Sequence, residues 1–175
     1  MTAETVLVAG VGNVFFGDDG FGVEVVRRLA QRELPSHVKV ADFGIRGVHL
    51  AYEMLNGYER TIIVDAVARG EPPGTVYVIE PDAAEIAAHV REAAAGAEAP
   101  LIDAHGLDPA SVLALSQHLD GSTGEVIIVG CEPAEITERM GLSAVVEAAV
   151  EPAIELVKDL LSVQESRSGT ATHRR

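Results

Sequence analysis

Short apolar runs rich in valine and isoleucine recur along the chain, and segments with helical spacing of apolar residues separate them. Runs of this kind predict strands, here at residues 6–11, 38–42, 61–65, 75–79 and 125–130. The longer segments predict helices at residues 21–34, 83–94, 110–119 and 143–161. Strands that alternate with helices predict an α/β fold: a three-layer α/β/α sandwich around a mostly parallel, five-stranded sheet.

Three local features add detail to this outline. Residues 72–75 (Pro-Pro-Gly-Thr) leave no room for a helical crossover, so we expect the fourth strand to run antiparallel to the third. Pro152 cannot donate to the carbonyl of Ala148, which predicts a kink in the last helix. Residues 163–175 are polar and without pattern, so we expect one domain over residues 1–162 and a disordered tail.

Charge narrows the possible partners. The chain has 175 residues and a formal net charge of −14, which argues against binding to nucleic acid or to an anionic membrane surface, because both require basic patches. No apolar run reaches the roughly 20 residues that span a bilayer, and the first residues lack the pattern of a signal peptide. We therefore expect a cytoplasmic protein.

The turn after the first strand, G-V-G-N-V-F-F-G-D-D-G-F-G at residues 10–22, begins like a dinucleotide-binding motif. Phe15 occupies the position of the third glycine, and Asp18 and Asp19 lie where the helix should already have begun. Two carboxylates at a helix N-terminus would repel a phosphate. Asp42, which ends the second strand as a ribose-binding acid would, keeps a nucleotide-binding α/β protein as a less favoured alternative.

The position of the acidic residues predicts a different ligand. In a doubly wound sheet of order 2-1-3, the carboxyl ends of the first and third strands open into one crevice. Asp18 and Asp19 follow the first strand, and Asp65 ends the third. Carboxylates in a crevice of low dielectric repel one another unless a proton or a cation lies between them, so we expect a divalent metal.

His105, in the loop before the helix at residues 110–119, is the candidate for a third ligand. Two carboxylates and one imidazole suit several first-row divalent ions. An ion with an open position could polarise a carbonyl or activate water for hydrolysis, or it could be a docking point for a partner's metal.

Four motifs occur in order along residues 6–161: G-V-G-N-V-F-F-G-D-D-G-F-G, D-F-G-I-R-G at 42–47, V-D-A at 64–66 and H-G-L at 105–107. Together they resemble the hydrogenase maturation peptidases. The resemblance implies a metal-dependent endopeptidase that removes a C-terminal extension from the large-subunit precursor of a nickel–iron hydrogenase, acting as a monomer or weak homodimer.

The resemblance also implies which residues carry the reaction. Asp19, Asp65 and His105 would contact nickel that the precursor supplies, with other divalent cations able to substitute, so that cleavage waits for metal insertion. The same three residues would be catalytic, and Asp18 would have a structural or helix-capping role.

Further alternatives remain open from the residues alone. A non-catalytic nickel- or precursor-binding chaperone would use the same side chains. A cysteine peptidase or amidase would use Cys131 with His105, although a cysteine after an apolar strand is typical of a buried residue. Phe15 and Phe16 could form an apolar wall for the substrate, and we expect at least one of them in the core.

Overall fold

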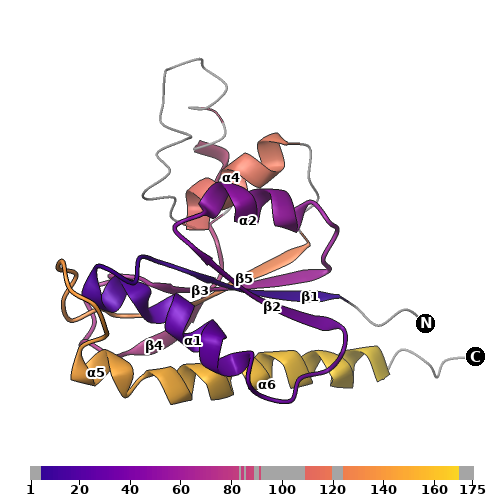
Figure 1. Ribbon diagram of the computed structural model, residues 1–175. Coiled ribbons are helices and arrows are strands. Elements are labelled where there is room, and N and C mark those ends of the chain that lie inside the picture. The colour runs from indigo at the N-terminus through magenta and orange to yellow at the C-terminus, as the bar shows by residue number, and fades with distance from the viewer. Residues whose placement is uncertain are drawn as a thin grey trace, which may run out of the picture.

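The computed structural model describes residues 5–82, 84, 86–88, 91, 109–119 and 124–169 (Figure 1). Five strands form one sheet in the order β2-β1-β3-β5-β4. Their bounds are β1 (Val6–Val11), β2 (Val38–Gly44), β3 (Arg60–Ala66), β4 (Val76–Ile79) and β5 (Glu125–Cys131). β1 pairs in parallel with β2 and β3, and β3 pairs in parallel with β5. The expected strands and the order 2-1-3 are confirmed.

The expectation that the fourth strand runs antiparallel to the third is confirmed. β4 runs antiparallel to the rest of the sheet, and its hydrogen-bonding partner is β5, which lies between β3 and β4. The reason is that the connection after β3 crosses the end of β5: Val67 N donates to the carbonyl of Cys131 (2.9 Å). Gly74 N then donates to the carbonyl of Glu132 (2.8 Å), and Glu132 N donates to that of Thr75 (2.9 Å). The chain thus reaches the far side of β5 before β4 begins.

Helices cover both faces of the sheet (Figure 1). On one face lie α1 (Phe21–Leu29), which follows the 3₁₀ helix η1 (Gly17–Gly20), and α6 (Val150–Gly169). On the other lie α2 (Gly47–Met54) and α4 (Pro109–His118). Residues 84, 86–88 and 91 are also helical, and Asp82 Oδ1 accepts a hydrogen bond from Ala84 N (2.7 Å), as in an N-cap. None of the helices in the described ranges is long and apolar enough to cross a membrane.

Two helical predictions need correction. α1 ends at Leu29, five residues before the predicted end at 34. The last helical segment is two helices, α5 (Ala144–Glu147) and α6. The break begins at Ala148, the residue to whose carbonyl Pro152 cannot donate. The segment from 163, predicted as a tail, is helical through Gly169, and residues 170–175 lie outside the described part of the chain.

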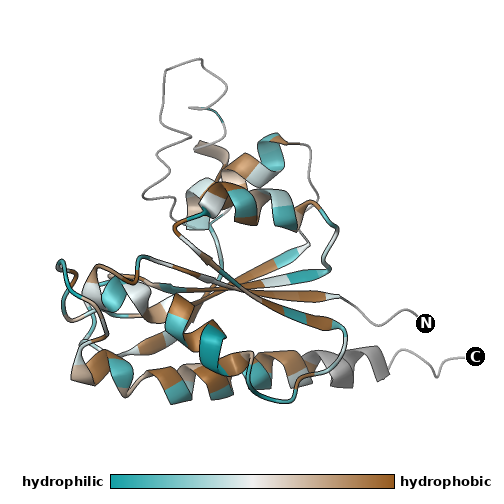
Figure 2. Ribbon diagram, viewed as in Figure 1, coloured by the Kyte–Doolittle hydropathy of each residue, from teal (hydrophilic) through white to brown (hydrophobic). Residues whose placement is uncertain are grey.

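Alternating residues of the strands supply a core on each face of the sheet (Figure 2). Val6 and Val8 of β1 pack under α1 and α6, whereas Leu7 and Ala9 pack under α2 and α4. Because both faces are covered, the central strands β1, β3 and β5 are mainly apolar runs in the sequence.

The start of α1 lies unusually close to the sheet. A Cβ atom at Gly22 would meet the carbonyl oxygen of Val64 at 2.0 Å and that of Val11 at 2.5 Å. Only glycine permits this approach, which brings η1 against the carboxyl ends of β1 and β3.

We expect Gly22→Ala to lower the free energy of unfolding by about 3 kcal/mol, because two strand carbonyls would have to move. Gly57→Ala is the control: Gly57 has a φ of 81° and open space around its Cβ position, so its cost is the left-handed backbone alone, about 1 kcal/mol. Urea unfolding measures both. Equal losses would contradict the close approach at Gly22.

Candidate active site

Asp18 anchors the first loop of the protein. Its side chain is fully buried. The carboxylate accepts hydrogen bonds from the backbone N–H groups of Ala134 (2.8 Å), Glu135 (2.9 Å) and Ser143 (2.6 Å), and from the Ser143 hydroxyl (2.8 Å). Burial raises the pKa of Asp18, but these hydrogen bonds outweigh it and hold the pKa below its ordinary value. The expected structural role of Asp18 is confirmed.

Backbone hydrogen bonds join the same two segments. Gly17 N donates to the carbonyl of Arg139 (2.8 Å), and Arg139 N donates to that of Phe15 (3.0 Å). Residues 13–20 and 132–143, hereafter the loop pair, therefore form one unit at the carboxyl edge of the sheet.

Asp19 projects from this unit and is partly exposed. Its Oδ2 atom accepts a hydrogen bond from Asn13 N (2.9 Å). The chain folds closely here, since a Cβ atom at Gly12 would lie 1.8 Å from the carbonyl oxygen of Asp19. The backbone therefore turns Asp19 back over the end of β1 instead of opening a cradle for phosphate.

Asp65 lies at the same edge. It is the penultimate residue of β3, is partly exposed, and pairs in register with Gly130 of β5. η1 packs against β3, so the loop that carries Asp19 and the strand end that carries Asp65 lie at the same end of the sheet. His105 lies outside the described residues. Within those residues, no three histidine, cysteine or acidic side chains form a metal-binding group, so the three-residue site stays a prediction.

The structure disfavours the other ligand and nucleophile assignments. Asp42 forms an ion pair with Arg27 of α1 (3.0 Å). A ribose would have to compete with Arg27 for this carboxylate. Cys131 is fully buried. Burial and the charges of Asp18 and Glu132 raise the pKa of its thiol to about 12, so it stays protonated and unreactive.

Glu132 has a role that sequence reasoning missed. Its buried carboxylate accepts hydrogen bonds from Arg69 N (2.7 Å), Gly70 N (3.3 Å) and the Tyr77 hydroxyl (2.9 Å). The Arg69 N–H, with the Tyr77 hydroxyl, lowers the pKa of Glu132. An acid directly after a buried strand is the signal that could have revealed it. Glu132 fixes the loop that follows Asp65.

Arg46, in the Gly-Ile-Arg-Gly segment, binds its own loop. Its guanidinium donates to the carbonyls of Phe43 (3.1 Å) and Asp42 (2.7 Å). This geometry supports a structural role at the turn between β2 and α2.

The expectation that Phe15 or Phe16 lies in the core is wrong: Phe15 is 60% exposed and Phe16 is 42% exposed. In the second segment of the loop pair, Ile136 (50%) and Met140 (68%) are exposed as well. Hydrogen bonds within the loop pair, rather than burial of Phe15 or Phe16, hold this segment in place. Four large apolar side chains of the loop pair are therefore exposed to solvent.

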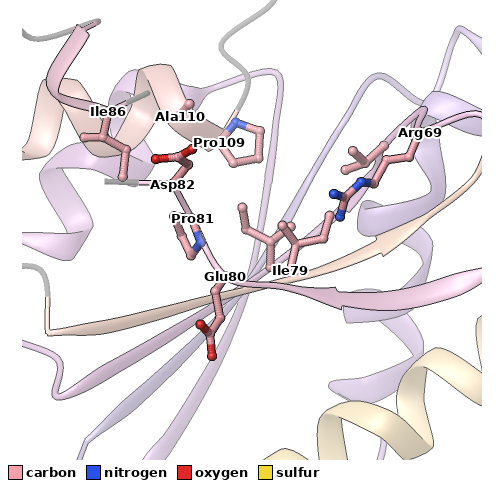
Figure 3. A pocket seen from close by; sticks show the side chains of 10 residues that line it. Arg69, Ile79, Glu80, Pro81, Asp82, Ile86, Pro109 and Ala110 are labelled. Carbon is pink, nitrogen blue, oxygen red and sulfur yellow. The ribbon is translucent and has the colours of Figure 1, made fainter. Parts of the chain in front are cut away.

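A cavity of about 400 Å³ lies on the α2 and α4 face of the sheet, between the segment after β4 and the start of α4 (Figure 3). Val67 and Arg69 contribute to its wall from the loop after Asp65. The protein is thus an α/β protein with acids at the switch point of a doubly wound sheet and a cavity nearby, which is the usual place for a ligand in such folds.

Comparison with known proteins identifies the family. The family described as hydrogenase maturation protease matches residues 23–160. The chain is 33% identical over 163 residues to the hydrogenase 2 maturation protease of Escherichia coli, covering 92% of both. It is 34% identical over 158 residues to the hydrogenase expression/formation protein HoxM of Cupriavidus necator, covering 89% of this chain and 73% of HoxM.

Solved structures agree. The hydrogenase maturating endopeptidase HybD of E. coli superposes with a TM-score of 0.69 at 30% identity, covering 93% of each chain. A hydrogenase 2 maturation peptidase from a Thaumarchaeota archaeon gives 0.65 at 32% identity, covering 90% of this chain and 97% of that one. The chain therefore belongs to the hydrogenase maturation protease family, as its motifs indicated, and it is an endopeptidase.

We expect Asp18→Asn to lower the free energy of unfolding by about 2 kcal/mol at pH 7, because an amide cannot accept all four hydrogen bonds. A lowered pKa means that the ionised carboxylate stabilises the fold above the ordinary value of 3.8. That contribution is lost as the pH falls through the lower, folded-state pKa. The difference between wild type and variant should therefore shrink below about pH 4.

Urea unfolding at several pH values tests this expectation. Asp159→Asn, on the exposed side of α6, is the matched control and should change stability little at any pH. A constant difference between wild type and Asp18→Asn from pH 7 to pH 3 would contradict the argument.

Proposed function

We propose that this endopeptidase removes the C-terminal extension from the large-subunit precursor of a nickel–iron hydrogenase, and that Asp19, Asp65 and His105 form its site. The observation that carries the proposal is the packing of η1 against β3, which brings two acids from distant parts of the sequence to one edge of the sheet. The matched family, whose members include hydrogenase maturation proteases, supports a hydrogenase as substrate.

Nickel already inserted into the precursor is the metal that this site recognises. Asn13 N holds only Oδ2 of Asp19, which leaves Oδ1 with the capacity to bind an ion. Carboxylate and imidazole ligands suit nickel and other first-row divalent ions, so these can substitute. Recognition of the substrate's own metal makes cleavage wait for metal insertion.

The chain's residues then position the bond to be cleaved. The two carboxylates and the imidazole orient the metal-bearing part of the precursor, and a water molecule polarised by the ion or by a carboxylate attacks the peptide carbonyl. Asp18 contributes indirectly, because it fixes the loop pair from which Asp19 projects.

The exposed apolar residues of the loop pair supply the docking surface for the precursor. Phe15 and Phe16 lie in the same loop as Asp19, and Asp19 N donates to the carbonyl of Phe16 (3.3 Å). Ile136 and Met140 are exposed on the segment that is hydrogen-bonded to this loop. A folded precursor that buries them would be aligned with the acids at the sheet edge.

We expect Asp19→Ala, Asp65→Ala and His105→Ala each to lower processing of nickel-loaded precursor at least a hundredfold or so, because each removes a ligand. Mass spectrometry measures the loss of the C-terminal extension, and Asp159→Asn is the charge control. Normal processing by any of the three variants would remove that residue from the site. Precursor that binds the wild type but stays full-length would favour the chaperone alternative.

We expect Phe15→Ser to raise the KM for the precursor about tenfold with little change in kcat, because the lost apolar contact serves docking alone. Val163→Ser is the control, since Val163 is 53% exposed on α6. A KM for Phe15→Ser equal to that of the control would show that the precursor docks elsewhere.

A further inference from the structure

The 400 Å³ cavity beside β4 has the chemistry of a peptide-binding site. Its lining is mainly apolar, from Val67, Ile79, Pro81, Ile86, Pro109 and Ile128. Its volume falls within the range of about 300–1,000 Å³ that small-ligand sites occupy. A cavity of this size accommodates one or two side chains of an extended peptide.

Arg69 is the one basic residue among those described in the cavity lining, and Glu80 and Asp82 are its acidic members. Figure 3 shows the guanidinium of Arg69 directed toward Ile79, whereas the carboxylate of Glu80 points away from Arg69. The described part of the chain contains eight ion pairs, and none of them involves Arg69. The guanidinium lies over the ring of Tyr77, 5.7 Å from its centroid. This contact orients the guanidinium and leaves its N–H groups able to bind a carboxylate.

The loop that carries Arg69 is held in place. Arg69 N donates to the buried carboxylate of Glu132 (2.7 Å), and the single proton of the Tyr77 hydroxyl is shared between Glu132 (2.9 Å) and the carbonyl of Val67. Because these bonds form without a ligand, binding requires little further ordering of the loop.

The cavity also lies within reach of the candidate active site. Arg69 is four residues after Asp65 in the sequence, and four extended residues span at most about 14 Å. A peptide bond held near Asp65 would therefore leave the next few residues of the substrate within reach of Arg69. In a chain of net charge −14, this cation reduces the repulsion that an anionic segment would meet.

We propose that the cavity holds the C-terminal extension of the precursor beyond the cleaved bond, and that Arg69 pairs with a carboxylate of that extension while apolar side chains fill the cavity. This inference rests on the proposed function, because it takes the extension to be the segment removed. Arg69 is then a specificity-determining residue that binds substrate without taking part in bond cleavage.

Binding of a labelled synthetic peptide with the sequence of the extension, followed by fluorescence anisotropy, tests the inference without cleavage. We expect Arg69→Gln to weaken binding about fivefold at low salt, with a smaller effect at high salt, because Arg69 is an exposed residue. Arg69→Lys should restore part of the affinity. Arg32→Gln, which removes the same charge from an ion pair with Glu151, should leave it unchanged.

A second variant tests the cavity independently of the charge. Ala110 lines the cavity from the start of α4, so Ala110→Leu should fill it and weaken binding of the same peptide. Circular dichroism on each variant separates lost binding from lost folding. Unchanged affinity in folded Arg69→Gln and Ala110→Leu would overturn the inference.

Two modified peptides identify the carboxylate. If the C-terminal carboxylate is the partner, amidation of the peptide should abolish the difference between wild type and Arg69→Gln. If an acidic side chain is the partner, its replacement by the amide should do so. A difference that survives both changes would overturn the pairing.

Processing of the full precursor separates this inference from the proposed function. Arg69→Gln should raise KM about fivefold and leave kcat unchanged. Precursor left intact by the wild type would count against the proposed function, whereas equal KM values for wild type and Arg69→Gln would count against the inference alone.

Discussion

One buried carboxylate organises the carboxyl edge of the sheet. Asp18 satisfies three backbone N–H groups and one hydroxyl of residues 134–143, which lie more than a hundred positions away in the sequence. A buried charge is costly unless it is fully hydrogen-bonded, and the same low dielectric makes a satisfied one strong. Everything displayed at this edge depends on that anchor: Asp19 follows it directly, and the exposed Phe15 and Phe16 precede it. The adjacent acids of the first loop therefore have different roles: Asp18 stabilises the fold, and Asp19 is left partly exposed at the edge of the sheet.

The first loop also shows how a glycine-rich turn after a strand can serve something other than phosphate. Gly12 lets the backbone of Asp19 close over the end of β1, and Gly22 lets α1 rest on the carbonyls of two strands. In a dinucleotide-binding turn, such glycines would admit the pyrophosphate to the helix N-terminus. Here protein backbone fills that space, and a short 3₁₀ helix presents acids instead. A similar spacing of glycines thus forms a turn that favours cations instead of phosphate.

Much of the fold could be predicted from the sequence because strands buried on both faces leave an unambiguous signal of β-branched runs. The short connection before the fourth strand predicted its antiparallel direction, but pairing partners leave no such signal, and the sequence did not show that this strand pairs with β5. Burial of Phe15 or Phe16 was expected from composition, but the hydrogen bonds that keep both in solvent come from residue 139, far along the chain. Glu132 was missed for the same reason: its partners lie about 60 residues earlier. Of the site, both acids could be assigned to one edge, because the topology of a doubly wound sheet fixes where strand ends meet.

In the proposed complex, the charges around this edge would distinguish the two ends of the bound peptide. Asp19 and Asp65 make one part of the edge negative, where a cation is favoured. Arg69, four residues beyond Asp65, adds a positive charge to the wall of the neighbouring cavity, where we propose that it pairs with a carboxylate of the substrate. A chain whose metal-bearing part precedes its free C-terminus fits this polarity in only one direction. Because opposite orientation would place carboxylate against carboxylate and metal against guanidinium, the arrangement disfavours wrong substrates by repulsion as well as favouring the right one by attraction.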